Sequence, residues 1–363
     1  MFSIHMRGTL PIACLLALCG LCACGGTAAP ARVSPPGAPV ADAAVPDAQP
    51  PPDRDAGTPM TPVSDAGAPD ASVPDAGPAD AGPAAPSLAG CPMFPAGNAW
   101  NRDVSGDSLD PHSADYLSFM GAGSLNLHPD FGGQYGQPFA VVPGTQARVT
   151  MTFLYASQSE AGPYPFPPDV PIQVDVDHHV TVLDQGECAL YETYNTYAQG
   201  GGFHADSGAR FDLTTGAPRP DGWTSATAAG LPILPGLARY DEAVEAGEIR
   251  HALAFVAGTT AHAYVAPATH SAGTSSAAWA PPMGLRVRLK AGYDLSGFHG
   301  ASLVVARALQ KYGMFLTDTA GGDFWSLAGA KDSRWPLQDL EQLKGIPASA
   351  FEVVQLPPVH NGL

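Results

Sequence analysis

The sequence predicts a mainly β fold, an antiparallel β-sandwich of jelly-roll or lectin-like type with a few short helices. Three observations predict it: apolar and polar residues alternate in many short segments, helix-like segments are few, and long Gly- and Pro-rich loops separate them. The clearest alternation is at residues 148–155, where Val, Met, Phe and Tyr alternate with Arg and Thr. Such a pattern buries one face of a strand and leaves the other in water.

The chain begins with features of an exported protein. Arg7 precedes an apolar stretch, residues 11–21, that is too short to span a bilayer and is typical of a signal peptide. The stretch ends in Leu21-Cys22-Ala23-Cys24, which resembles a bacterial lipobox. The resemblance implies that residues 1–23 are a lipoprotein signal peptide and that acyl chains, palmitate among them, attach to Cys24. We therefore expect a membrane partner, contacted through the lipid anchor.

The residue after the lipidation site bears on location. Gly25 stands where an Asp would be the usual signal for retention in the inner membrane. We therefore expect a cell-envelope protein anchored in the outer membrane and facing the periplasm or the exterior.

Residues 24–87 are expected to form a disordered tether. They consist almost wholly of Ala, Pro, Asp, Gly, Ser, Thr and Val, without an aromatic residue. Such a segment cannot bury enough apolar surface to offset the entropy of ordering. Residues 88–363 contain all five Trp, and we expect them to fold as a single β-rich domain.

Hairpins and one disulfide are predicted in this domain. Residues 180–190 alternate around Asp184-Gln185-Gly186-Glu187, a plausible hairpin turn. Residues 249–256 and 262–266 flank Gly258 in a second expected hairpin, and residues 285–289 form a strand expected to have one wet face. Of the six Cys, only Cys91 and Cys188 follow the lipidation site, and an even pair in an oxidising compartment favours a disulfide.

Helices are expected at three places. Residues 301–312 have an amphipathic pattern and are followed by Gly313, a residue typical of the position after a helix. Residues 337–344 and 240–246 are shorter candidates.

The charge of the chain excludes some partners. The formal net charge is −17 and the isoelectric point about 4.8. Because the domain has no run of basic residues, we expect no nucleic-acid partner, and anionic polymers are repelled at long range. No motif in the sequence indicates a cofactor.

The strongest candidate site lies in residues 203–213. If they form one strand, His204, Asp206 and Arg210 share its polar face and line a groove. A solvated strand face would show the same alternation, so this alternative stays open.

Two loops contribute similar side chains. His128 and Asp130 lie in a Gly-rich loop, and His270 follows a predicted strand. Together with His204 and Asp206 they would suit a metal ion, but no local ligand spacing supports one, so no metal is predicted. Ser271 follows His270, but no Gly-x-Ser-x-Gly motif indicates a serine hydrolase.

Carboxylates in aromatic surroundings suggest work on sugars. Glycoside hydrolysis requires two carboxyl groups, one with a raised pKa as acid and one ionised. Glu192 shares a predicted strand face with Tyr194, and Glu160 opens a stiff loop that contains Tyr164. The candidates for this pair are Asp130, Glu160, Glu192 and Asp206, and the aromatic candidates for stacking on a sugar ring are Tyr164, Tyr194 and Trp223, with Arg210 beside them. The alternatives without a role in a site are that Glu192 is a charge on an edge strand and that Trp223 anchors its loop.

Four segments carry a resemblance to known proteins. They are Leu127-His128-Pro129-Asp130-Phe131-Gly132, Gly222-Trp223-Thr224-Ser225-Ala226, Gly230-Leu231-Pro232-Ile233-Leu234-Pro235-Gly236 and Ala308-Leu309-Gln310-Lys311-Tyr312-Gly313-Met314. These segments resemble a widespread family of secreted bacterial proteins, and the acidic tether behind the lipobox resembles lipoproteins of myxobacterial type. The resemblance covers residues 91–359, implies one domain rather than two, and implies no substrate.

Two classes of function follow from these observations. The chain is expected to be a lipid-anchored carbohydrate-active enzyme, either a glycoside hydrolase or a polysaccharide lyase, with a polysaccharide as partner. The catalytic candidates are Asp130, Glu160, Glu192, His204, Asp206 and His270. The alternative is a non-catalytic glycan-binding or envelope-scaffolding lipoprotein.

Overall fold

The computed structural model describes residues 85–131, 135–174, 177–320 and 325–362. These residues all belong to one compact unit. The predicted signal peptide, the lipid attachment site Cys24 and residues 24–84 of the predicted tether lie outside them. No helix in the described part of the chain is long and apolar enough to cross a membrane.

The described residues confirm a mainly β fold. They form five sheets and a few short helices. The largest sheet has six strands in the order β16-β13-β14-β11-β15-β3. Its strands are β3 (Leu127–Asp130), β11 (Leu253–Ala257), β13 (Arg286–Leu289), β14 (Met314–Thr319), β15 (Trp325–Ala328) and β16 (Phe351–Val353).

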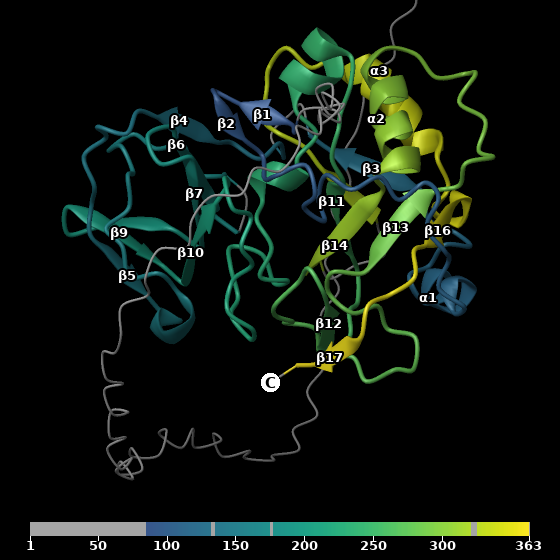
Figure 1. The fold of residues 1–363 in the computed structure, drawn as a ribbon, viewed down its shortest axis with the longest axis horizontal. Coiled ribbons are helices and arrows are strands. Elements are labelled where there is room, and N and C mark those ends of the chain that lie inside the picture. Colours follow the sequence, from purple (N-terminus) through teal and green to yellow (C-terminus); the bar gives the residue numbers. More distant parts are fainter. Residues whose placement is uncertain (1–84, 132–134, 175–176, 321–324, 363) are drawn as a thin grey trace, which may run out of the picture. The chain divides into compact units, whose positions relative to one another are not determined.

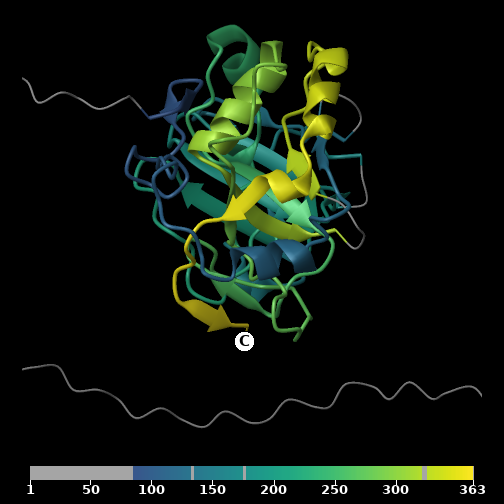
Figure 2. The same cartoon turned by 90° about the vertical axis from the view of Figure 1, so that its right-hand side faces the viewer.

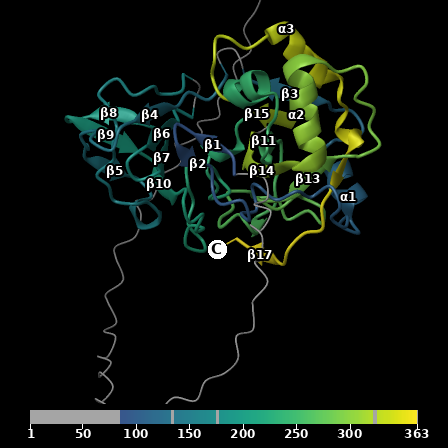
Figure 3. The same cartoon turned by 45° about the horizontal axis from the view of Figure 1, so that its top comes forward.

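A four-stranded sheet in the order β10-β7-β6-β4 forms the second large element. Figures 1 and 3 show its strands gathered on one side of the molecule and the six-stranded sheet on the other. Its strands are β4 (Ala140–Val142), β6 (Val180–Asp184), β7 (Ala189–Tyr194) and β10 (Ser207–Asp212). The predicted hairpin is confirmed, because β6 and β7 pair antiparallel around the turn at residues 185–188.

Three smaller sheets complete the β structure. A three-stranded sheet, β5-β9-β8, packs beside the four-stranded sheet, and two pairs, β1-β2 and β12-β17, lie at the margins. Their strands are β1 (Ser87–Leu88), β2 (Cys91–Pro92), β5 (Met151–Phe153), β8 (Tyr197–Gln199), β9 (Gly202–Ala205), β12 (Ala263–Val265) and β17 (Val359–Asn361).

The sheets are mixed, so the prediction of a purely antiparallel fold is wrong. Parallel pairs join β11 to β14, β3 to β15, β4 to β6 and β5 to β9. Parallel neighbours require a long connection, and here β13 and a helix lie between β11 and β14 in the chain. The expected second hairpin is also wrong, because β12 leaves β11 and pairs with β17 instead.

The predicted helix near residue 301 is confirmed as α2 (Gly300–Lys311). Its buried residues include Ala301, Val305 and Leu309, spaced four apart along one face, and Gly313 follows at φ 65°, the left-handed conformation expected after a helix. Figure 2 shows α2 against the strands of the six-stranded sheet. The other helical segments are α1 (Ser113–Phe119), α3 (Leu337–Leu340), a 3₁₀ turn at Glu341–Gly345 and a π-helical turn at Asp241–Ala246.

The strand at 285–289 has no wet face, contrary to prediction. All four residues of β13 are buried, including Arg286 and Arg288. The Arg286 guanidinium donates to the backbone carbonyls of Ala99 and Tyr312 at 2.9 and 2.8 Å. Buried arginines are tolerated because carbonyl acceptors replace the lost water.

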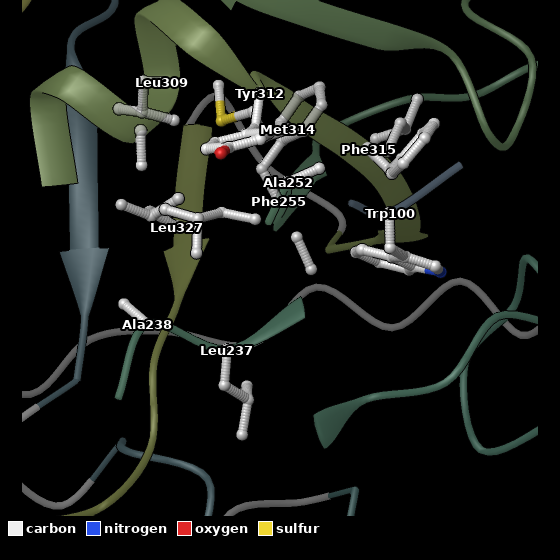
Figure 4. Packing of buried hydrophobic residues seen from close by; sticks show 14 of the residues in the cluster. Trp100, Leu237, Ala238, Ala252, Phe255, Leu309, Tyr312, Met314, Phe315 and Leu327 are labelled. Carbon is white, nitrogen blue, oxygen red and sulfur yellow. The ribbon is translucent and has the colours of Figure 1, made fainter. Parts of the chain in front are cut away.

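The four-stranded sheet is buried on both faces because its strands alternate between two apolar clusters. In β7, Leu190 packs in the cluster shared with the six-stranded sheet, and Tyr191 packs in the smaller cluster shared with β5 and β9. The larger cluster contains Trp100 and Phe315, whose ring centroids lie 4.9 Å apart. Figure 4 shows these rings with Phe255 and Leu327 in the core of the six-stranded sheet.

The predicted disulfide is confirmed between Cys91 and Cys188, which are 97 residues apart. It joins β2, at the start of the domain, to the turn of the β6–β7 hairpin.

Replacing both cysteines by Ser should lower stability far more than activity. In the chain-entropy model, releasing a loop of this size costs about 4 kcal/mol, or roughly 10 °C in melting temperature for a domain of this size. Differential scanning calorimetry of the oxidised protein and the double variant measures the difference. An unchanged melting temperature, or two alkylatable thiols in exported protein, would contradict it.

Candidate functional site

A cavity of about 1120 Å³ opens between the four-stranded and six-stranded sheets. Its wall on one side includes Tyr194 and Ser207, from the ends of β7 and β10. The opposite wall includes residues of β3, β11, β14 and β15, among them His128 and Asp318. A loop, residues 224–233, passes along the cavity and contributes Ala228 to its lining.

Asp318, near the end of β14, and Asp177 are the carboxylates among the described residues that line the cavity. The oxygens of Asp318 accept hydrogen bonds from the backbone N–H groups of Ala228 and Thr319, at 3.1 and 2.7 Å. Burial, together with the nearby charge of Asp177, nevertheless raises the pKa of Asp318 to about 6. Asp318 is therefore a carboxyl group that can hold a proton close to neutral pH.

His270 is held by the same residue that contacts Asp318. Its Nδ1 donates to the carbonyl of Ala228 at 2.8 Å, because a carbonyl only accepts hydrogen bonds. In the neutral ring the lone pair is then on Nε2, in a side chain that lines the cavity. The backbone N–H and C=O groups of Ala228 thus hold the Asp318 carboxyl group and the His270 ring on the same wall of the cavity.

The Ala228 loop is rigid because its hydroxyl groups bond to its own backbone. Ser225 and Thr227 both donate to the carbonyl of Leu231, at 2.7 and 2.9 Å. Gly230 lies at φ 71°, and a Cβ there would come within 2.2 Å of the Thr269 hydroxyl, so only glycine fits this turn. These bonds and the turn at Gly230 therefore fix the position of Ala228.

Tyr194 lies close to both cavity carboxylates. Burial raises its pKa, and the charges of Asp177, Asp206 and Asp318 raise it further. Tyr135 and Tyr155 line the same cavity with 56% and 49% of their surface exposed. Aromatic rings that are both at a cavity wall and open to solvent can stack on a ligand.

Two further histidines line the cavity. The Nε2 of His179 donates to the carbonyl of Ala226 at 2.9 Å, and its Nδ1 lies 2.7 Å from the side-chain oxygen of Gln173. His128 comes from β3, on the opposite sheet. Among the described residues, no three His, Cys, Asp or Glu side chains are placed to hold a metal ion.

The predicted strand 203–213 is wrong. The chain turns at Asp206, so that β9 belongs to the three-stranded sheet and β10 to the four-stranded sheet. His204 lies 3.0 Å from Thr152, and Asp206 accepts a hydrogen bond from Asn195 at 3.0 Å. Neither residue lines the cavity. The alternation of polar and apolar residues continues past Asp206, so the sequence pattern does not reveal that the chain passes there from one sheet to another.

Arg210 and Glu160 take part in ion pairs outside the cavity lining. Arg210 contacts Glu187 at 3.1 Å, and Glu160 contacts the buried guanidinium of Arg219 at 2.6 Å. That guanidinium also lies 5.5 Å from the ring of Trp223, which gives this loop aromatic a packing role.

Three other residues from the sequence analysis, Tyr164, Tyr194 and Asp130, differ in where the structure places them. The Tyr164 side chain is fully buried in the smaller apolar cluster, where it cannot stack on a sugar. Of the predicted aromatic ligands, Tyr194 alone lines the cavity as described. Asp130 is the last residue of β3, and its side chain lies outside the described part of the structure.

Glu192 is buried beneath the cavity, on the same face of β7 as Tyr194. Its carboxylate oxygens accept hydrogen bonds from the backbone N–H groups of Ile233 and Leu234, at 2.8 and 3.0 Å. Burial raises the pKa of Glu192 to about 7, although these two bonds oppose the shift. Glu192 fixes the loop that carries Ala228 rather than facing a ligand.

The structure thus brings together His128, His270 and Tyr194 from the sequence analysis and adds Asp177 and Asp318. Asp318 comes two residues after the apolar run Met314-Phe315-Leu316, so a carboxylate at the end of a short apolar run was a usable signal. Asp177 has no such signal, because it lies in an irregular segment.

Comparisons with known proteins give no identification. No family model matches this chain, and no match was found among curated proteins or solved structures. The function must therefore be argued from the cavity itself.

Replacing Glu192 by Ala should destabilise the fold. The change leaves two buried backbone N–H groups without acceptors, at a cost of about 2–5 kcal/mol in the free energy of unfolding. Urea denaturation at pH 6 measures the loss. Exposed Glu245, replaced by Ala, is the control and should change stability by less than about 0.5 kcal/mol; equal effects of the two changes would exclude this role.

Glu192 should also make stability depend on pH. Because the folded-state pKa of about 7 exceeds the ordinary value of 4.5, the native state keeps a proton that the unfolded chain has lost. The contribution of Glu192 is therefore largest below pH 4.5 and falls as the pH rises towards 7. The Glu192→Gln variant should show a flatter stability curve than the wild type over this range, and parallel curves would contradict the assignment.

Proposed function

We propose that this protein is a glycoside hydrolase whose active site is the cavity between the two large sheets. The observation that carries the proposal is the carboxylate pair: Asp318 has a pKa raised to about 6, and Asp177 is close enough to contribute to that shift. Hydrolysis of a glycosidic bond requires one carboxyl group that donates a proton and another that is ionised.

Each group has a role in this reaction. Asp318 donates its proton to the oxygen of the leaving sugar as the glycosidic bond breaks. Asp177 supplies the negative charge that stabilises the oxocarbenium-like transition state, and water then completes the hydrolysis. His270, with Nδ1 bonded to Ala228, offers Nε2 as a hydrogen-bond acceptor for a sugar hydroxyl.

The shape of the cavity suits a saccharide. Its volume of about 1120 Å³ accommodates more than one sugar ring, and Tyr135 and Tyr155 offer exposed faces for stacking. Gln137, Gln158 and Gln173 add amide groups that bond sugar hydroxyls.

The lining favours a hydrolase over the other predicted class, a polysaccharide lyase. A lyase acts on uronic acids, whose carboxylate must be neutralised before a proton leaves the adjacent carbon. Among the described residues that line the cavity there is no Lys or Arg, whereas Asp177 and Asp318 are both acidic. An anionic sugar would therefore be repelled.

A non-catalytic glycan-binding protein is the second candidate. The exposed rings of Tyr135 and Tyr155 favour it, because they would hold a sugar without any reaction. In such a protein Asp318 would serve only to hold the Ala228 peptide, as Glu192 holds its neighbours, whereas the enzyme also uses the raised pKa of Asp318, which is why the enzyme is preferred.

The expected location and fold type belong to the same proposal. The lipobox and the resemblance to secreted lipoproteins support a protein tethered to the outer membrane by acyl chains on Cys24, where it would meet extracellular or periplasmic glycans. The two large sheets on either side of the cavity support a sandwich arrangement.

Replacing Asp318 by Asn should lower kcat by about 10²-fold or more, because the amide keeps the shape but cannot donate the proton. The full chain is incubated with a polysaccharide panel, and reducing-sugar release is measured. Exposed Asp115, replaced by Asn, is the matched control, and Asp206→Asn should also retain activity because Asp206 does not line the cavity. If both Asp206→Asn and Asp318→Asn lose activity while remaining folded, the assignment of Asp318 as the only acid is wrong, and the acid must be sought among the residues predicted from sequence. Release of unsaturated uronides instead of reducing sugars would identify a lyase.

The pH profile provides an independent test. Because Asp318 must be protonated to act as acid, kcat/KM should decline as the pH rises through about 6, the pKa raised by burial and by Asp177. Tyr194 and His270 face the same space but do not replace this proton donor. A profile that rises through pH 6 would contradict the assignment of Asp318 as acid.

A further inference from the structure

The charges around the cavity specify the kind of sugar that fits it. No Arg or Lys pairs with Asp177 or Asp318 in the described part of the chain. The two carboxylates therefore share a space that contains negative charge without a fixed cation.

Three tyrosines, Tyr135, Tyr155 and Tyr194, line the same cavity as the two carboxylates. The charges of Asp177, Asp206 and Asp318 all act on Tyr194, and of these three carboxylates Asp177 and Asp318 line the cavity, as Tyr194 and Tyr155 do. The face of a tyrosine ring attracts cations, so the phenol rings and the carboxylates favour the same sign of charge in a ligand.

We propose that the cavity binds glycans that carry free amino groups, such as a deacetylated hexosamine, in preference to neutral sugars. An ammonium group beside Asp177 would be attracted by its carboxylate, by Asp318 whenever that group is ionised, and by the tyrosine faces. A neutral sugar would gain none of these charge interactions. The net charge of −17 adds a long-range attraction for cationic chains. This inference rests on the proposed function, since it names the substrate class of the same cavity.

The test uses three ligands that differ at one atom group. The full chain is titrated with the methyl β-glycosides of glucosamine, N-acetylglucosamine and glucose, which carry an ammonium, an acetamide and a hydroxyl group at carbon 2. Binding is measured by NMR at low salt and again at 0.5 M NaCl (about the concentration at which screening shortens the Debye length below 5 Å). We expect Kd for the glucosamine ligand to be about tenfold lower than for glucose, and the preference to shrink in high salt.

A matched pair of variants locates the preference. Asp177→Asn should bring the three Kd values together because it removes one of the two carboxylate charges, whereas Asp115→Asn, at an exposed site, should leave the preference unchanged. Equal or weaker binding of the glucosamine ligand by the wild type would overturn the inference, as would a preference that Asp177→Asn does not alter.

Failure of this inference can be distinguished from failure of the proposed function. If the protein releases reducing sugar from neutral glycans but does not prefer the amino sugar, the hydrolase proposal stands and only the proposed substrate class is wrong. Preferential binding of the amino sugar without hydrolysis of chitosan or any other glycan sustains the inference and points to the glycan-binding alternative.

Discussion

One loop, bonded through its backbone N–H groups to a carboxylate on each sheet, sets the geometry of the cavity. Glu192 on β7 accepts from Ile233 and Leu234, and Asp318 on β14 accepts from Ala228. A carboxylate has enough acceptor capacity to fix peptide groups that belong to no sheet. The loop therefore lies at a defined position between two sheets that otherwise meet through apolar contacts. Because Ala228 also accepts from His270, the relative position of the acid and the imidazole depends on this arrangement.

The elements that could be predicted from sequence are those whose signals are local. The β6–β7 hairpin contains the turn-forming sequence Asp184-Gln185-Gly186-Glu187, helix α2 has an apolar face and Gly313, and the disulfide follows from the two remaining cysteines. Strand pairing was harder to predict, because alternation indicates a strand but not its partner. Residues 203–213 alternate throughout, yet the chain passes from one sheet to another at Asp206.

The candidate site was predictable only in part for the same reason. His128 and His270 were found because each lies in a polar loop-like context, but Asp177 and Asp318 are 141 positions apart in sequence and meet only through tertiary structure. Glu192 was predicted to have a raised pKa from its apolar and aromatic neighbours, and it has one. Its position beneath the loop, where both oxygens accept backbone N–H groups, could not be derived from spacing, since Ile233 and Leu234 lie about 40 residues further along the chain.

The disulfide has a mechanical consequence. Any pull on the N-terminal side of the domain reaches the fold at Cys91, where the covalent bond carries the force directly to Cys188. Residues 92–187 lie inside the closed loop and are shielded from that tension as long as the bond is intact. The load then falls on β7, whose neighbours β6 and β10 hold it on both sides by antiparallel hydrogen bonds. For a chain attached by one end, strands β4 to β6 could therefore keep their places under strain while the rest of the molecule is stretched.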